Sequence, residues 1–229
     1  SHGDCMVRIP GSGDDQRVIA LVESIPTRFA DIGLRISTGP VVMFRATDFL
    51  VRHPRAAGSV PLLLPHNIKP FATTWPLVKN GKPASITMCA ESSRLLVPTR
   101  NYVLLKRFSA KEEKRRLVAG CFLRDEHPVP RIGIENHVNY VYHADRELSQ
   151  DEVYGIAAVF NSTLLDRYFR TISGNTQVNA TEIRAMKFPD LPTLARIGKR
   201  IRDENIDWEA IVMEELGTSD THRKHLLPA

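Results

Sequence analysis

The sequence lacks the short motifs that usually identify an active site. It has no CxxC pair and no HExxH, and its eight histidines are scattered, so the spacing of a zinc site is absent. It also lacks a GxxxxGK[ST] phosphate loop, a GxSxG elbow and a GxGxxG stretch after a strand. Residues 11–15 are glycine-rich and acidic, but the stretch is too short for a nucleotide loop and predicts a plain turn. These absences favour a binding module over an enzyme.

Long apolar runs and leader features are missing as well. No run approaches the roughly 18 apolar residues of a membrane span, and no charged start precedes an apolar core. The three cysteines, Cys5, Cys89 and Cys121, lie far apart, and an odd number fits a reducing compartment better than a disulfide framework. We therefore expect a soluble cytoplasmic protein with no membrane partner.

The net charge of +5 conceals an uneven distribution along the chain. Thirteen lysine and arginine residues lie between Arg52 and Arg116, against three acidic residues, and the rest of the chain is acidic overall. A basic block of this kind fits a surface that binds a polyanion, because each neutralised phosphate releases counterions. A merely solvated surface is the alternative interpretation.

The pattern of apolar and turn residues predicts an α+β fold with short, mostly antiparallel strands from about 40 to 145. Seven prolines between Pro54 and Pro98 exclude long helices from that region. Alternation and β-prone composition predict strands at 41–44, 49–51, 102–108, 116–123 and 136–143. Upstream of these strands, residues 18–34 predict a helix with a glycine near its end.

The second half of the chain predicts helices. Ser149 and Glu152 have the spacing of a capping box, in which each side chain bonds the other residue's backbone amide. Apolar residues then recur in steps of three and four from Val153 to Tyr168, which predicts one long helix of about five turns. Residues 194–202 and 208–216 predict two closing helices.

Three segments together resemble a known family. They are 101–117 (NYVLLKRFSAKEEKRRL), 133–140 (GIENHVNY) and 160–170 (FNSTLLDRYFR), the last continuing through 173–184. In this order and spacing they resemble the C-terminal half of TaqI-like type II restriction–modification adenine methyltransferases. Residues 37–42 and 61–68 also resemble parts of that half. The resemblance covers most of residues 30–190.

The resemblance implies a division of labour. In that family an N-terminal domain binds S-adenosylmethionine, and an Asn/Asp-Pro-Pro-Tyr/Phe loop receives the flipped adenine. Neither the glycine-rich cofactor strand nor a Pro-Pro loop occurs here. The resemblance therefore implies the target-recognition half of an adenine methyltransferase, which grips double-stranded DNA and helps the target base leave the stack. We expect this chain to bind no cofactor and to be non-catalytic alone, with S-adenosylmethionine used by the parent enzyme.

The same resemblance implies domain boundaries and partners. Residues 1–36 are expected to be the tail of an upstream domain or a linker, 37–190 the target-recognition domain, and 191–229 a helical extension. The expected partners are duplex DNA and a methyltransferase domain upstream in the same chain. Whether an endonuclease accompanies them stays open.

Candidate DNA-binding residues form three groups. The turn 175–179 is expected to read bases, because Asn and Gln amides can pair with adenine edges; the alternative is that these amides bond their own turn. Arg184, which follows, is expected to contact a phosphate. A second group of cations is expected to contact the DNA backbone: Lys106, Arg107, Lys111, Lys114, Arg115 and Arg116. The third group lies in a proline-bounded loop and comprises His66, Asn67 and Lys69. The full set comprises Asn175, Thr176, Gln177, Asn179, Arg184, Lys106, Arg107, Lys111, Lys114, Arg115, Arg116, His66, Asn67 and Lys69.

Several polar and aromatic residues are expected to be structural instead. Either Asn136 or Asn139 is expected to be a buried, hydrogen-bonded organiser of its strand. Trp75 and Phe71 are expected to belong to the core.

Two other functions remain open from the sequence alone. The basic block would equally dock an acidic protein partner. Alternatively, Asp125, Glu126 and Glu135 would converge on a magnesium ion in a nuclease domain. The nuclease hypothesis requires carboxylates that cluster in space, whereas DNA recognition requires none.

Overall fold

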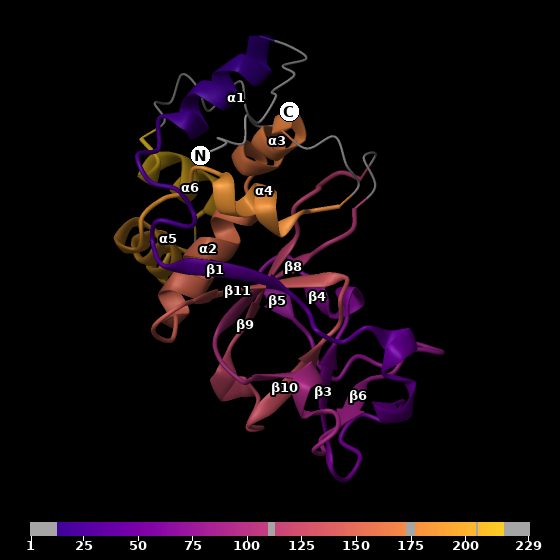
Figure 1. Ribbon diagram of the computed structural model, residues 1–229. Coiled ribbons are helices and arrows are strands. Elements are labelled where there is room, and N and C mark those ends of the chain that lie inside the picture. The colour runs from indigo at the N-terminus through magenta and orange to yellow at the C-terminus, as the bar shows by residue number, and fades with distance from the viewer. Residues whose placement is uncertain (1–12, 110–112, 173–176, 205, 218–229) are drawn as a thin grey trace.

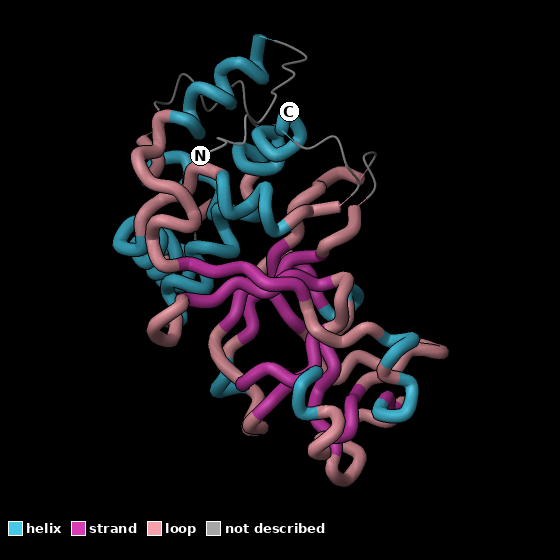
Figure 2. The backbone as a smooth tube through the Cα atoms, viewed as in Figure 1, coloured by secondary structure: helices cyan, strands magenta, loops and turns pink. Residues whose placement is uncertain are grey.

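The computed structural model describes residues 13–109, 113–172, 177–204 and 206–217. Helices gather in the upper part of the molecule and short strands in the middle and lower parts (Figure 1, Figure 2). Within the described ranges the helices are α1 (Gly13–Glu23), α2 (Gln150–Asn161), α3 (Thr163–Ile172), α4 (Ala180–Ala185), α5 (Leu191–Asp203) and α6 (Trp208–Glu215). None of these helices has the length and apolar character needed to span a bilayer.

The strands form two main sheets and a small ribbon. The first sheet has the order β1 (Leu34–Thr38), β11 (Val138–His143), β8 (Tyr102–Lys106), β9 (Ala119–Phe122). The second has the order β2 (Leu50–Val51), β6 (Ser85–Thr87), β3 (Ser59–Leu63), β10 (Arg131–Ile134), β7 (Leu96–Pro98). The ribbon pairs β4 (Ile68–Lys69) with β5 (Ala72–Thr73). Among these strands only β3 and β10 pair in parallel, so the predicted α+β fold with mostly antiparallel strands is confirmed.

Strand β8 lies between two cores. Its alternate residues Val103 and Leu105 pack with the helices, whereas Tyr102 and Leu104 pack with residues of the second sheet. This division follows from the two-residue period of a strand, which sends successive side chains to opposite faces. The first sheet is therefore the central layer, with helices on one face and the second sheet against the other (Figure 1).

The helical core includes both ends of the described chain. Val18 and Val22 of α1, Ile197 of α5 and Ile211 of α6 are all fully buried in the same cluster. The flanking helices therefore belong to this core, with α1 packed on α3, and α5 and α6 packed on α2.

The predicted capping box at the start of α2 is confirmed. The Ser149 hydroxyl accepts from the Glu152 amide at 3.2 Å, and the Glu152 carboxylate accepts from the Ser149 amide at 2.8 Å. The prediction of a single five-turn helix is wrong, because the helix divides at Ser162. That residue has an extended backbone (ψ 145°), and its hydroxyl donates to the Val159 carbonyl at 2.7 Å and accepts from the Leu165 amide at 3.2 Å. Ser162 thus ends one helix and caps the next.

Two predicted segments near the N-terminal end also differ from the structure. The helix expected over 18–34 ends at Glu23. Leu34, the last residue of the expected helix, instead begins strand β1, in which the side chains of Leu34 and Ile36 are buried in the core. Of the strand expected at 41–44, only Val41 pairs, through a bridge to Glu135, and Met43–Arg45 forms a 3-10 turn. A short apolar run does not show whether the segment forms a helix, a strand or a turn, because a strand forms only where a partner strand lies beside it.

The turn expected at 11–15 is wrong in its described part, because Gly13, Asp14 and Asp15 begin α1, where acidic side chains favour a helix N-terminus. The other predicted elements are confirmed. The segments expected at 102–108 and 116–123 contain the antiparallel pair β8 and β9, and 136–143 contains β11. The expected strand at 49–51 is reduced to β2. The two closing helices are α5 and α6, the second followed by Gly217 in a left-handed conformation (φ 72°).

Candidate nucleic-acid interface

Arg107, immediately after β8, joins three segments of the chain. Its backbone amide donates to the His137 carbonyl at 2.9 Å, and its carbonyl accepts from the Val178 amide at 2.7 Å. Its guanidinium donates to the Asn136 carbonyl at 3.0 Å and to the Gln177 side-chain oxygen at 3.4 Å. The end of β8, the turn before β11 and the segment before α4 are therefore held at one place.

The candidate base-reading turn is described only in its second half. Asn175 and Thr176 lie outside the described residues. Gln177 is exposed and lies beside Phe108, with which it forms an isolated bridge. Asn179 is the N-cap of α4, where its side chain accepts from the Thr181 amide at 2.9 Å. Gln177 is thus available to a ligand, whereas Asn179 is engaged within its own turn.

Arg184 lies beside the edge strand β1, whereas Lys106 lies on β8, with β11 between the two strands. The Arg184 side chain is exposed and donates to the Ile36 carbonyl of β1 at 3.0 Å. Lys106 ends β8 and is half-exposed. Both cations lie at the surface of the central sheet, where an anion can approach them.

The basic segment 114–116 divides into exposed and buried cations. Lys114 is exposed, and Lys111 lies outside the described residues. Arg115 donates to the Asn161 carbonyl and forms an ion pair with Glu209 at 2.6 Å. The prediction that Arg116 contacts the DNA backbone is wrong, because this residue is only 2% exposed. Burial also lowers the pKa of its guanidinium. Of the described members, Lys114 is the one most open to solvent.

The loop 66–69 is also divided. Asn67 is buried, and its side chain accepts from the Leu64 amide at 2.8 Å and donates to the Thr74 carbonyl at 2.8 Å. This corrects the expectation that Asn67 contacts DNA, because its amide organises the loop instead. Burial lowers the pKa of His66 from its ordinary value of 6.5, which favours the neutral ring at neutral pH. Lys69 is exposed and keeps its place among the candidates.

The expected buried organiser is Asn139. Its side chain is fully buried, donates to the Val178 carbonyl at 2.9 Å and accepts from the Thr38 hydroxyl at 2.9 Å. Asn136 is only half-buried. The expectation that Phe71 and Trp75 belong to the core is confirmed in part, since both are half-buried and pack against core clusters.

Sequence reasoning missed the Glu135–His137 pair. Glu135 is 1% exposed; one carboxylate oxygen accepts from the His137 amide at 2.9 Å, and the other lies 2.9 Å from His137 Nδ1. The sequence predicts Glu135 only as a candidate metal ligand and assigns no role to His137. A Glu-x-His spacing next to a tight turn is the signal that indicates this arrangement.

The nuclease hypothesis requires a cluster of metal ligands. Asp125 and Glu126 lie in the short turn 124–126, and Glu135 is directed to His137. In the parts of the chain that the structure describes, no group of three His, Cys, Asp or Glu side chains is arranged to hold a metal ion. The geometry therefore does not favour that alternative.

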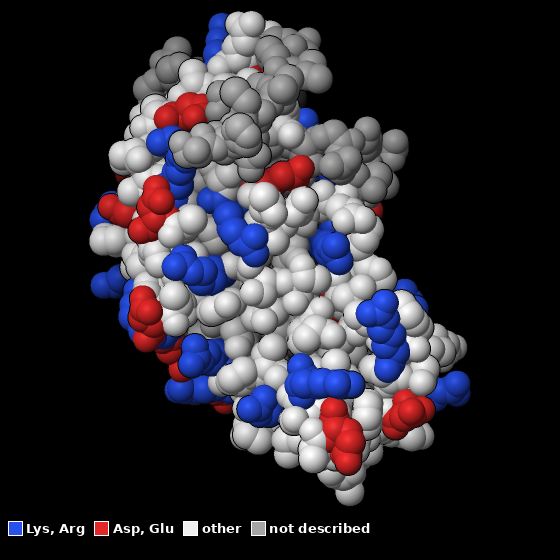
Figure 3. Space-filling model, viewed as in Figure 1, with Lys and Arg blue, Asp and Glu red and all other residues white. Residues whose placement is uncertain are grey.

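Exposed cations are spread over the face shown in Figure 3. Lysine and arginine side chains lie across the middle of this face, over β1 and the strands beside it, while many of the carboxylates lie toward the left edge and the lower end. Exposed cations of the basic block are Arg52, Arg55, Lys69, Lys79, Lys82, Arg94, Arg100 and Lys114. Most of the positive charge predicted from the sequence is therefore available to an anionic partner.

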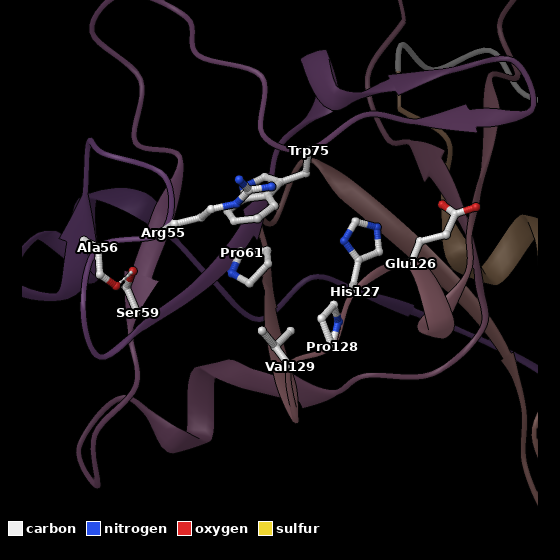
Figure 4. Close-up of a pocket in the computed structure, with 9 residues that line it drawn as sticks. All are labelled: Arg55, Ala56, Ser59, Pro61, Trp75, Glu126, His127, Pro128 and Val129. Carbon is white, nitrogen blue, oxygen red and sulfur yellow. Dashed lines mark hydrogen bonds between the residues drawn. The ribbon is translucent and has the colours of Figure 1, made fainter.

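A hollow of about 450 Å³ lies in the strand-rich part of the molecule (Figure 4). Trp75 forms one wall, and its ring nitrogen donates to the Ala84 carbonyl at 2.7 Å. Pro61, Pro128 and Val129 add apolar surface, and in Figure 4 the Glu126 carboxylate points away from the other labelled residues. Ser59 and His127 also line the hollow, and the His127 ring stacks on Phe122 with 4.4 Å between ring centres.

Known proteins resemble the chain in sequence and in fold. No family model matches it. The type II methyltransferase M.PstI of Providencia stuartii is 34% identical over 201 residues, which are 88% of this chain and 39% of M.PstI. The type II methyltransferase M.BsuBI of Bacillus subtilis is 40% identical over 177 residues, which are 77% of this chain and 35% of M.BsuBI. The chain thus spans less than two fifths of the length of these curated relatives.

A solved structure shares the fold. The type IIG restriction endonuclease BpuSI matches with a TM-score of 0.53 and 10% identity, over 95% of this chain and 34% of that protein. The chain is therefore an α+β module of a kind that also occurs within a restriction endonuclease. By sequence, the chain is similar to one part of these two type II methyltransferases. The resemblance predicted at the family level is confirmed.

Proposed function

We propose that this chain recognises a specific sequence in double-stranded DNA for a type II methyltransferase. The observation that carries the proposal is the junction at Arg107, which places the exposed Gln177 beside the half-buried Arg107 guanidinium at the end of β8. Amide side chains distinguish base edges, and cations hold phosphates. The relatives named as type II methyltransferases supply the context for such an interface.

The parent protein is proposed to be an adenine methyltransferase that uses S-adenosylmethionine. This chain would supply recognition, and a methyltransferase domain elsewhere in the parent would supply the chemistry. The adenine preference rests on the resemblance of residues 101–117, 133–140 and 160–184 to that class. We further propose residues 37–190 as the recognition domain proper, with 1–36 joining it to the upstream domain and 191–229 as a helical extension.

Salt-dependent binding is the first test. The chain is mixed with a labelled random-sequence duplex, and affinity is measured between about 50 mM and about 200 mM salt. A slope of about −0.9 per neutralised phosphate is expected, and repeated selection from the random pool should enrich one sequence. Binding that is flat across salt, or a pool that stays random, would contradict the proposal and favour a protein-interaction module.

A double variant tests base reading. Asn175→Ala with Gln177→Ala, introduced into the full-length parent, should lower methylation of the selected sequence well before it lowers non-specific DNA binding. The matched control is Asn179→Ser, which keeps a capping hydroxyl at the start of α4 and should leave both activities close to wild type. Equal loss of both activities in the double variant would remove the base-reading role.

A further inference from the structure

Two exposed phenylalanines each lie beside an arginine. Phe44 is 75% exposed, and the Arg45 guanidinium lies 5.2 Å from the centre of its ring. Phe108 is 41% exposed, and the Arg107 guanidinium lies 5.5 Å from the centre of its ring. Each pair, which we call an Arg–Phe pair, presents an aromatic surface and a positive charge together. A nucleic acid offers both complementary features, stacked bases and phosphates.

One turn anchors both Arg–Phe pairs. Val41, three residues before Phe44, forms a bridge with Glu135, and its carbonyl accepts from the Asn136 amide at 2.9 Å. On the other side, the Arg107 amide donates to the His137 carbonyl at 2.9 Å. The turn 135–137 therefore contacts both the segment that leads to Phe44 and the residue that precedes Phe108.

Side-chain contacts stabilise the turn 135–137. The buried Glu135 carboxylate accepts from the backbone amide of His137 and also contacts the ring of that residue. The His137 ring packs edge-on against Phe108, with 4.8 Å between ring centres. Phe108 is further fixed by its bridge to Gln177. An aromatic side chain held in this way loses little conformational entropy when it contacts a ligand.

We propose that Phe44 and Phe108 contact bases of the bound duplex by inserting against base steps, while Arg45 and Arg107 face the flanking phosphates. This inference rests on the proposed function and names the side chains that deform the DNA. Apolar side chains that insert between bases unstack them at a cost of about a few kcal/mol per step, which the additional contacts offset. Two wedges anchored on one turn distort the duplex at two fixed positions.

The test uses Phe44→Ala and Phe108→Ala. Each is measured on the duplex selected from the random pool, with 2-aminopurine placed along it as a fluorescent reporter of unstacking. Each variant should lose about tenfold in affinity, as expected when one aromatic–base contact is removed. The 2-aminopurine signal at one position should disappear with each variant, and the salt slope should stay unchanged because no cation is removed.

Two substitutions serve as controls. Ile206→Ala removes a 55% exposed apolar side chain between α5 and α6 and should change neither affinity nor fluorescence. Phe108→Gln keeps a side chain of some length beside His137 but removes the apolar ring, so it should still reproduce the loss if Phe108→Ala fails to fold. Thermal unfolding of every variant checks the fold.

The salt dependence of DNA binding tests whether the arginines of the Arg–Phe pairs face phosphates. Arg45→Gln should reduce the salt slope by about one phosphate equivalent. The matched control is Arg196→Gln, which removes the same charge from a 57% exposed side chain of α5 and should leave the slope unchanged.

The outcomes separate the inference from the proposed function. If the wild-type chain binds DNA with a steep salt slope but both phenylalanine variants bind and fluoresce like wild type, the wedge inference is overturned and the proposed function stands. If the wild-type chain does not bind DNA in a salt-dependent manner, the proposed function itself fails.

Discussion

The side-chain amide of Asn139 donates a hydrogen bond to the backbone carbonyl of Val178 at 2.9 Å, in the interior of the protein. The same side chain accepts from the Thr38 hydroxyl at 2.9 Å. One buried amide therefore links β11 with β1 and with the segment that carries Gln177. The position of the candidate base-reading residue depends on this link.

Replacement of Asn139 by leucine tests this link. The leucine has the same number of side-chain heavy atoms and the same branching but leaves the Val178 carbonyl and the Thr38 hydroxyl without their partner. We expect the free energy of unfolding to fall by about 1–3 kcal/mol, because a buried polar group without a partner loses its solvation. Urea unfolding measures the loss.

Asn136→Ala is the control, since that side chain is only half-buried. Its effect should stay within about 0.5 kcal/mol. Equal destabilisation by the two substitutions would show that Asn139 has no special role.

The sequence predicted the elements around Asn161 but not the role of that residue. Its side chain accepts from the Ala119 amide at 2.9 Å and donates to the Ala119 carbonyl at 2.8 Å. In this way a side chain at the end of α2 bonds the backbone amide and carbonyl of Ala119 on β9, the edge strand of the first sheet. The helical period was visible in the sequence, whereas the partner 42 residues away was not, because periodicity contains no information on long-range contacts. This contact gives a structural reason for an Asn-Ser pair at the end of α2.

The crossing of α2 and α5 depends on two glycines. A Cβ atom at Gly155 would lie 1.8 Å from the Leu194 carbonyl oxygen, and one at Gly198 would lie 1.7 Å from the Asp151 carbonyl oxygen. Gly155→Ala or Gly198→Ala must therefore push the two helices apart. We expect a loss of about 1–3 kcal/mol for each, typical of overpacking in a rigid core. Thermal unfolding should show a lower midpoint for both.

Gly13→Ala is the matched control. It lies in α1 with open space around its Cβ position, so alanine should be neutral or slightly stabilising. Wild-type midpoints for the α2 and α5 variants would show that the helices tolerate a wider crossing.

The stability of the protein should depend on pH through Glu152. Burial raises the pKa of this carboxyl, but hydrogen bonds from Arg146 and Ser149 outweigh that effect, and the net pKa lies below the ordinary value of 4.5. The folded state therefore binds a proton less readily than the unfolded state. The stabilisation is present above about pH 4.5 and is lost as the pH falls through the folded-state pKa.

Glu152→Gln should flatten this part of the stability curve. The glutamine does not titrate, so urea unfolding below about pH 4.5 should lose less stability per pH unit than in wild type. Arg146→Met removes the ion pair at 2.6 Å, so the pKa of Glu152 should rise and the same interval should flatten. If both variants lose stability with falling pH as steeply as wild type does, a group other than Glu152 causes the loss.

The candidate site was predictable in outline only. The sequence located the basic block and the segments around Arg107, because charge and resemblance are local properties. It did not separate exposed from buried members, since Asn67 and Arg116 are buried by contacts with distant residues. Phe44 and Phe108 were not singled out at all, because an exposed aromatic residue has the same sequence signal as a buried one.

Lys114 and Arg115 are adjacent cations with opposite predicted roles. Lys114 is exposed, so Lys114→Gln should reduce the salt slope of DNA binding by about one and leave stability unchanged. Arg115 binds Glu209, a carboxylate that is 8% exposed, and its guanidinium lies over the Trp208 ring at 5.7 Å. Arg115→Gln should therefore lower the free energy of unfolding by about 1–3 kcal/mol and leave the salt slope of the folded protein close to wild type.

The two substitutions remove the same charge from neighbouring positions, so each is the control for the other. Salt-dependent anisotropy and urea unfolding, measured on both variants, give four values. The assignment requires the slope to change in Lys114→Gln and the stability to change in Arg115→Gln. The reverse pattern would mean that Arg115 leaves Glu209 to bind a phosphate, and that the ion pair seen in the structure breaks when DNA binds.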